Sequence, residues 1–183
     1  MRVIGGAARG RSIKAPRNSA VRPTSDRVRE AIFDVLTHLA GVDEVEGAQV
    51  LDLFAGSGGL GIEALSRGAG AVTFVEQDRT LAAAISENLR ATGLERTGQH
   101  QVVRAEVLAY LASTSRSFDL ALIDPPYAFE DWTTLLGRLE ADLVVLESRR
   151  PVELGDRFDL YRVYRHGTTL VTVARRRGEQ ART

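Results

Sequence analysis

The sequence contains no cysteine, which excludes disulfide bridges, thiolate metal sites and cysteine nucleophiles and fits a reducing cytoplasm. Its three histidines lie far apart and form no recognisable metal spacing: His38, His100 and His166. No apolar run approaches the roughly 20 residues of a membrane span, and the N-terminus lacks a signal-peptide core. We therefore expect a cytoplasmic protein that needs neither a metal nor a membrane.

A net charge is also absent, but the charges are unevenly distributed. Residues 1–30 carry eight Arg and Lys against two acids, residues 31–147 carry seven against eighteen, and residues 148–183 carry nine against four. Basic ends around an acidic middle favour an anionic polymer bound beside a separate catalytic core. For Arg175, Arg176 and Arg177 a solvated basic tail is an equally good interpretation. For the N-terminal end we favour nucleic acid.

Short apolar strands alternate with helices from residue 49 onward. We expect strands at 49–54, 71–76, 100–104, 118–123 and 142–147, and helices at 59–67, 80–92 and 131–140. This alternation predicts an α/β protein with a parallel, doubly wound sheet. Residues 157–164 and 168–174 are β-rich and predict a terminal antiparallel hairpin. Ligands of such sheets bind beyond the carboxyl ends of the strands, where we expect four acids in one crevice: Asp52, Glu76, Glu106 and Asp124.

Residues 2–15 contain two short extended pieces around glycines and predict a β-hairpin. Their apolar content is too small for an independent core, so we expect the hairpin to project from the main domain. Five basic side chains would then contact phosphates: Arg2, Arg9, Arg11, Lys14 and Arg17. The helix that follows is capped by Thr24 or Ser25 and leaves Arg22, Arg27 and Arg29 available to a ligand or to solvent.

A strand, a glycine turn and a helix start follow one another at residues 50–61, and we call residues 54–58 the glycine loop. Gly56, Gly58 and Gly61 match the dinucleotide fingerprint, which leaves NAD as one interpretation. The carboxylate of Asp52 just before the loop would repel a pyrophosphate and attract an ammonium group. We therefore favour S-adenosylmethionine, which has an ammonium group and no phosphate. A plain packing turn with a solvated Asp52 is the third interpretation.

Asp124-Pro125-Pro126-Tyr127, here called the proline turn, directly follows an expected strand. Two prolines hold the turn stiff. The Asp124 carboxylate and the Pro125 carbonyl can accept both hydrogens of a planar amino group, and a base can stack on Tyr127. A rigid turn with a capping aspartate is the alternative. We expect Trp132 and Phe129, which follow the turn, to serve in packing.

The glycine loop and the proline turn together resemble the paired signatures of S-adenosylmethionine-dependent amino-group methyltransferases. Ile4-Gly5-Gly6, Gly10-Arg11 and residues 22–30 are similar to the bacterial RsmD family, which methylates guanine N2 in 16S ribosomal RNA. The resemblance covers nearly the whole chain. It implies a Rossmann-like class I methyltransferase fold with a seven-stranded, mostly parallel sheet. It also implies a small ribosomal subunit or its assembly intermediate as substrate, with guanine 966 as the target.

The resemblance also assigns residues to roles. The turn residues Asp124, Pro125, Pro126 and Tyr127 are expected to be catalytic. The donor, which leaves as S-adenosylhomocysteine, would be bound by Asp52, Phe54, Gly56, Ser57, Gly58, Glu76, Gln77 and Glu106. Glu76 would hold the ribose hydroxyls. Glu106 stands where the family usually has aspartate, so its contact with adenine is the least supported of these. RNA would be bound by Arg2, Arg9, Arg11, Lys14, Arg17, Arg22, Thr24 and Arg27.

These expectations divide the chain into an RNA-contacting extension (1–22), a methyltransferase domain (23–177) and a disordered tail (178–183). We expect a monomer. Three other functions stay open at this point. A DNA adenine-N6 methyltransferase would use the same proline turn, although 183 residues leave no room for a separate sequence-reading domain. A dehydrogenase would use the glycine loop, and a non-catalytic assembly factor would use only the basic surface.

Overall fold

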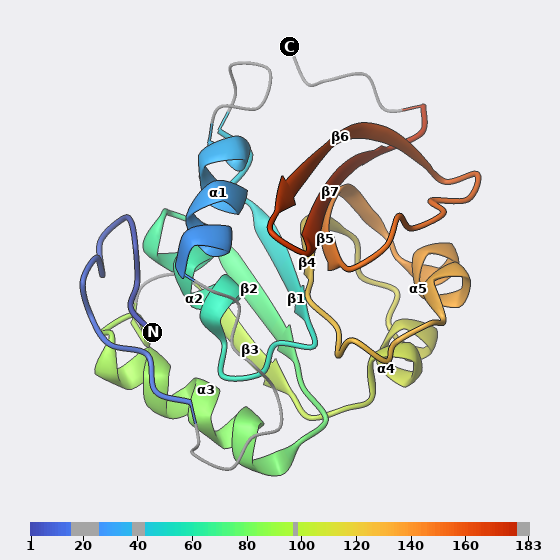
Figure 1. Ribbon diagram of the computed structural model, residues 1–183. Helices are drawn as coiled ribbons and strands as arrows, with labels where there is room; N and C mark the ends of the chain where they lie inside the picture. Colours follow the sequence, from blue (N-terminus) through green and yellow to red (C-terminus); the bar gives the residue numbers. More distant parts are fainter. Residues whose placement is uncertain (16–25, 38–42, 97–98, 179–183) are drawn as a thin grey trace.

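The computed structural model describes residues 1–15, 26–37, 43–96 and 99–178. Seven strands form one sheet in the order β3-β2-β1-β4-β5-β7-β6 (Figure 1). Their bounds are β1 Gln49–Leu53, β2 Ala71–Val75, β3 Gln99–Val103, β4 Phe118–Ile123, β5 Ala141–Ser148, β6 Phe158–His166 and β7 Thr169–Arg176. The first five strands are parallel, whereas β7 runs antiparallel to both β5 and β6. The expected mostly parallel sheet and its terminal hairpin are confirmed.

In the described part of the chain, five helices cover the two faces of the sheet (Figure 1). Helices α1 (Asp26–Leu36), α2 (Gly59–Ser66) and α3 (Arg79–Ala91) pack on one face, where β1 contributes Val50. Helices α4 (Val107–Ser113) and α5 (Trp132–Arg138) pack on the other, where β1 contributes Leu51 and Leu53. Strands buried on both faces explain the continuous apolar runs of the sequence. The alternation along β1 also fixes the face to which Asp52 belongs, which is that of α2.

The sequence did not predict α4. Its seven residues, VLAYLAS, are too few to show a helical period. The helix begins there because the Glu106 carboxylate accepts hydrogen bonds from the backbone N–H groups of Leu108 and Ala109 at its first turn.

The N-terminal segment, residues 1–15, does not project from the domain, so this expectation was wrong. It does turn back on itself, with an antiparallel bridge between Arg2 and Ser12. Its apolar side chains, however, are buried in the core beside α2 and α3: Val3, Ala8 and Ile13. Polar groups of α2 hold its backbone as well, since Ser66 Oγ accepts from Ala8 N at 2.9 Å. Docking on a neighbouring helix replaces the independent core that the segment lacks.

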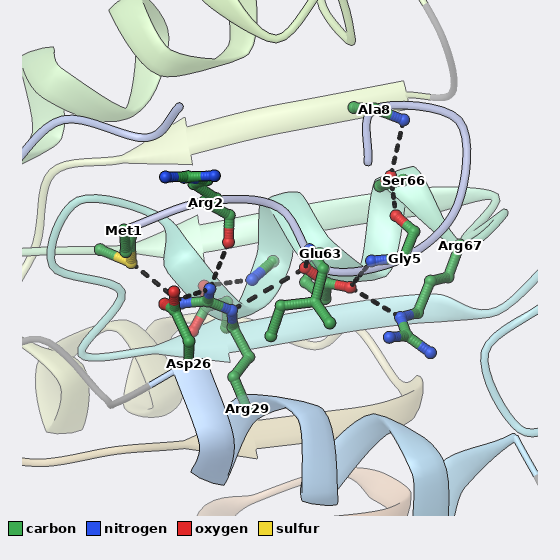
Figure 2. Close-up of polar contacts among 12 residues, drawn as sticks. Met1, Arg2, Gly5, Ala8, Asp26, Arg29, Glu63, Ser66 and Arg67 are labelled. Carbon is green, nitrogen blue, oxygen red and sulfur yellow. Dashed lines mark hydrogen bonds and ion pairs between the residues drawn. The ribbon is translucent and has the colours of Figure 1, made fainter. Parts of the chain in front are cut away.

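Arg29 was expected to be available to a ligand, and this was also wrong. Its side chain is fully buried between α1 and the N-terminal segment (Figure 2). One amino group, Nη2, donates to Asp26 Oδ1 at 2.9 Å and to the carbonyl oxygen of Arg2. Its Nε lies 3.8 Å from Glu63 Oε2 on α2. A buried arginine requires such partners. Asp26 lies one helical turn away, whereas Arg2 and Glu63 are too distant in sequence for a helical pattern to indicate.

Within the described residues, no helix is both long and apolar enough to cross a membrane.

Candidate active site

The carboxyl ends of β1, β2 and β4 meet at one edge of the sheet. Leu53 at the end of β1 pairs with Val75 of β2 and with Ile123 of β4. Chain order runs from β1 to β2 and β3 on one side and continues with β4 and β5 on the other. This reversal is the switch point at which doubly wound sheets bind their ligands. The glycine loop follows β1 there, and the proline turn follows β4.

Glu76 holds the glycine loop against the end of β2. Its Oε2 accepts a hydrogen bond from Gly56 N at 2.8 Å, and its Oε1 accepts one from Asp78 N at 2.8 Å. The side chain is only 7% exposed, so a merely solvated strand-end acid does not describe it. Gln77 follows as an exposed residue at the same edge. Both predicted donor-binding residues therefore lie beside the loop.

Asp52 lies beneath the loop, with 1% of its surface exposed. Its Oδ2 accepts a hydrogen bond from Gly61 N at 2.9 Å. Burial, together with the nearby carboxyl groups of Asp124 and Glu76, raises the pKa of Asp52 to about 8 against the opposing hydrogen bond from Gly61. The interpretation of Asp52 as a solvated turn residue is thereby excluded. The influence of Asp124 and Glu76 on Asp52 also indicates that these three acids lie close together.

Close packing explains why glycine follows at position 61. A Cβ there would lie 2.3 Å from the Phe74 ring and 2.9 Å from Asp52 Oδ2. The glycine loop itself uses left-handed backbone at Phe54, with φ of 59°, and at Gly58, with φ of 86°. A left-handed phenylalanine is a strained feature of the kind found at binding sites. Gly58 is the N-cap of α2 and supplies no side-chain cap. Hydrogen-bond acceptors for the N–H groups at the helix start must therefore come from elsewhere in the protein or from a ligand.

An aromatic chain connects the glycine loop to the proline turn. The rings of Phe54 and Phe129 meet edge to face, with 5.1 Å between their centroids, and Phe129 meets Trp132 in the same way at 5.2 Å. Phe129 and Trp132 are partly buried against the core of the α4 and α5 face, as expected. Phe129 N also donates to Pro126 O at 2.8 Å, which closes the turn. The two motifs are therefore fixed relative to each other.

A cavity of about 420 Å³, which we call the turn cavity, opens beside the proline turn. It is lined by the four residues of that turn and by the end of β5 and the segment after it, including Glu147 and residues 148–152. Tyr127 is 58% exposed, and the Arg149 guanidinium lies 3.6 Å from the centre of its ring. Such an exposed, cation-capped ring is a ready stacking surface.

Glu147 and Arg149 were not predicted as site residues. Glu147 ends an expected strand, and the sequence does not show that this strand lies next to the proline turn. Burial, and after it the charge of Asp124, raise the pKa of Glu147 to about 8. A carboxyl group at the end of a parallel strand was the only signal available, and it is a weak one.

Glu106, the residue predicted to contact adenine, has a structural role at the start of α4. Its carboxylate caps α4. Contact of this residue with adenine stays a prediction. No cluster of three or more His, Asp or Glu side chains suited to a metal occurs within the ranges that the structure describes.

Basic side chains of the N-terminal segment and of α1 face solvent: Arg2, Arg9, Arg11, Lys14 and Arg27. The guanidinium of Arg11 also donates to the carbonyl of Thr92. Three other predicted RNA-binding residues, Arg17, Arg22 and Thr24, lie outside the described residues. A contact that the sequence did not predict joins the segment to the donor side. Asn88 of α3 donates to Lys14 O and to Ser57 O, both at 2.9 Å.

Similar proteins identify the family of this chain. A family model described as Conserved hypothetical protein 95 matches residues 1–174. Putative rRNA methyltransferase YlbH of Bacillus subtilis is 38% identical over 191 aligned positions, which cover 97% of this chain and all of that protein. Ribosomal RNA small subunit methyltransferase D of Escherichia coli K12 is 39% identical over 127 residues, or 69% of this chain. The match spans only 60% of that protein's length.

The fold agrees with these relatives. The solved structure of the putative methyltransferase yhhF from Escherichia coli superposes with a TM-score of 0.82 at 31% identity, and the match covers 98% of this chain and 99% of that one. The chain therefore belongs to the Conserved hypothetical protein 95 family, which is the RsmD family of methyltransferases.

Proposed function

We propose that this protein transfers a methyl group from S-adenosylmethionine to the exocyclic N2 of a guanine in 16S ribosomal RNA. The observation that carries the proposal is the meeting of the glycine loop, Glu76 and the proline turn at the switch point, beside a cavity of about 420 Å³. By family membership the target is guanine 966, in a small subunit or its assembly intermediate. The relatives' names, which refer to ribosomal RNA of the small subunit, support this substrate.

The acids around the glycine loop fit a cationic donor better than a dinucleotide. Glu76 and Asp124 lie close enough to Asp52 to raise its pKa. The ionised carboxylates among these three acids would repel a pyrophosphate, whereas they would attract an ammonium or sulfonium group, which would also favour the charged form of Asp52. Glu76 is positioned for the ribose hydroxyls, and the backbone of Gly56, Ser57 and Gly58 lines the approach to the donor. When bound, S-adenosylmethionine supplies an electrophilic methyl group, so the chemistry requires no metal.

The proline turn holds the target base. The carboxylate of Asp124 and the carbonyl of Pro125 accept the two hydrogens of the amino group, and Tyr127 stacks on the ring. Guanine N2 is a poor nucleophile because its lone pair is delocalised into the base. Holding the nitrogen in line with the methyl group therefore supplies much of the acceleration. Asp124 also stabilises the positive charge that develops on nitrogen, and the methylated nitrogen then loses its proton readily. The target base must be unpaired or flipped to enter the cavity.

The RNA contacts basic side chains of residues 1–22, namely the exposed Arg9 and Lys14 and also Arg17 and Arg22, which lie outside the described residues. Thr24, Arg27 and the exposed Arg2 and Arg11 complete the predicted contact surface. Residues 23–177 form the methyltransferase domain. Within this proposal the enzyme acts as a cytoplasmic monomer.

Replacing Asp124 tests the proposed role of the proline turn. We expect Asp124→Ala to bind S-adenosylmethionine with nearly unchanged affinity and to lose about two to three orders of magnitude in turnover, as removal of a charge-stabilising group does. The measurement is nucleoside analysis of 16S RNA from cells that lack the gene and carry either version. Asp156→Ala, an exposed acid before β6, is the control. Unchanged turnover in the Asp124 variant would contradict the mechanism.

A further inference from the structure

Glu147 is a carboxyl group that the mechanism above does not use. On β5 it follows Leu146, which pairs in parallel register with Ile123 of β4. The next residues in that register are Glu147 and Asp124, and side chains at matched positions of parallel neighbours point to the same face of a sheet. Both residues line the turn cavity. Glu147 therefore lies beside the residue that holds the amino group of the base.

The environment of Glu147 is incomplete without a ligand. Its Oε2 is shielded from solvent and has no hydrogen-bond partner within the described ranges. A buried polar atom without a partner costs free energy and requires an explanation. Glu147 lines a cavity of the size of a small ligand, so a group of the substrate can provide the missing partner.

The nearness of Asp124 also decides which form Glu147 takes. Two adjacent, half-buried carboxyl groups disfavour the state in which both are ionised, because the charged forms repel each other. The pKa of Glu147, which is raised to about 8, agrees with one proton for the two carboxyl groups, held by Glu147. Asp124 then acts as the anionic acceptor, and Glu147 presents an O–H donor next to a carbonyl acceptor.

This pair of groups matches the edge of guanine. Beyond its amino group guanine presents N1–H, a donor, and then O6, an acceptor. Adenine presents the ring nitrogen N1, an acceptor, beside its amino group and has no oxygen beyond it. A neutral carboxyl group makes both hydrogen bonds only with guanine. We propose, on the basis of the proposed function, that Glu147 selects guanine by accepting from N1–H and donating to O6 while Asp124 holds N2.

The test changes the base and the side chain together. Small-subunit particles are reconstituted from 16S RNA with either guanosine or 2-aminopurine riboside at the target position. 2-Aminopurine keeps the N2 amino group, lacks O6 and has a lone pair in place of N1–H. The wild-type enzyme should favour guanosine by about tenfold or more in kcat/KM, since a site built for hydrogen bonds rejects an analogue that lacks them.

The variants separate hydrogen bonding from charge and from folding. Glu147→Gln has the same donor and acceptor as a neutral carboxyl group and should keep the preference. Glu147→Leu has neither and should reduce the preference to about threefold or less. Binding of S-adenosylmethionine and the midpoint of thermal unfolding, measured on both variants, report whether the fold and donor site are intact. Glu153→Leu, an exposed acid outside the cavity, should behave as the wild type.

Two results would overturn the inference. One is a Glu147→Leu enzyme that keeps the wild-type preference while it still binds the donor. The other is a Glu147→Gln enzyme that loses the preference as fully as Glu147→Leu does. If the wild-type enzyme forms no product with guanosine particles, the proposed function itself is contradicted, and the role of Glu147 in selecting guanine is overturned with it.

Discussion

Asp52 shows how a buried carboxyl group can lower the stability of the protein that carries it. Its carboxyl group is buried, and its pKa is raised to about 8 from an ordinary value of 3.8. Between these two values the folded protein holds a proton that the unfolded chain has lost. The free energy of unfolding therefore has its full value, as far as Asp52 is concerned, below pH 3.8. It falls as the pH rises from 3.8 toward 8.

This sign leads to a prediction for Asp52→Asn. An amide oxygen can still accept from Gly61 N but carries no charge, so the variant should unfold at a higher temperature than the wild type. The difference should be small at pH 5 and should grow toward pH 8. Thermal unfolding of both proteins at several pH values measures it. A difference that narrows as the pH rises would contradict the burial account of Asp52.

Among single residues, the sequence predicted those that can be recognised from their immediate neighbours in the chain. The acid before the glycine loop and the acid before two prolines are recognisable from neighbours in the chain alone, and the structure places both at the switch point. Glu147 could not be found in this way. Its relation to Asp124 depends on the register of β4 and β5, and that register is set by packing between segments about twenty residues apart in the chain.

Helix α2 connects the glycine loop to the N-terminal segment. It begins at the glycine loop, and farther along it carries Glu63, whose side chain is fully buried. Glu63 accepts hydrogen bonds from the backbone of Ile4 and Gly5 and from Arg67 Nε, each at 2.8 Å, and it lies beside Arg29 (Figure 2). One carboxylate thus fastens the N-terminal segment to both α1 and α2.

Removing this charge should loosen the N-terminal segment. We expect Glu63→Gln to lower the free energy of unfolding by about 3 kcal/mol, because it removes the buried carboxylate beside Arg29 and leaves one acceptor oxygen for the donors of Ile4, Gly5 and Arg67. Denaturant unfolding measures the change. Glu87→Gln alters an exposed acid of α3 and should stay within about 0.5 kcal/mol of the wild type. Equal stability of the two variants would show that Glu63 does not anchor the segment.

Secondary structure was largely predictable at the scale of elements, because strands buried on both faces and helices with a glycine stop have clear patterns. The positions of α2 and α3 agree with the expectation to within one residue. The N-terminal segment was misjudged because its stability comes from another element. Nothing in residues 2–15 shows that α2 supplies a buried glutamate, and nothing in α1 shows that Arg29 turns inward to meet it.

Considered as a whole, the molecule places basic groups on both sides of an acidic site. Arg149 and Arg150 border the turn cavity, and the exposed cations of the N-terminal segment belong to the part of the chain that packs on α2 and α3. Asn88 bridges that segment to Ser57 of the glycine loop. Under the proposed function, a strand of RNA that follows the cations would deliver one unpaired base to the proline turn while the donor lies across the switch point.

The central claim is methyl transfer to guanine N2, and one measurement tests it most directly. The purified protein is incubated with labelled S-adenosylmethionine and small ribosomal subunits from cells that lack this gene, and the labelled nucleoside is then identified. The account predicts N2-methylguanosine in 16S RNA and no label on DNA. Label on DNA adenine, with none on the subunits, would contradict the account and assign the proline turn to an adenine-N6 methyltransferase.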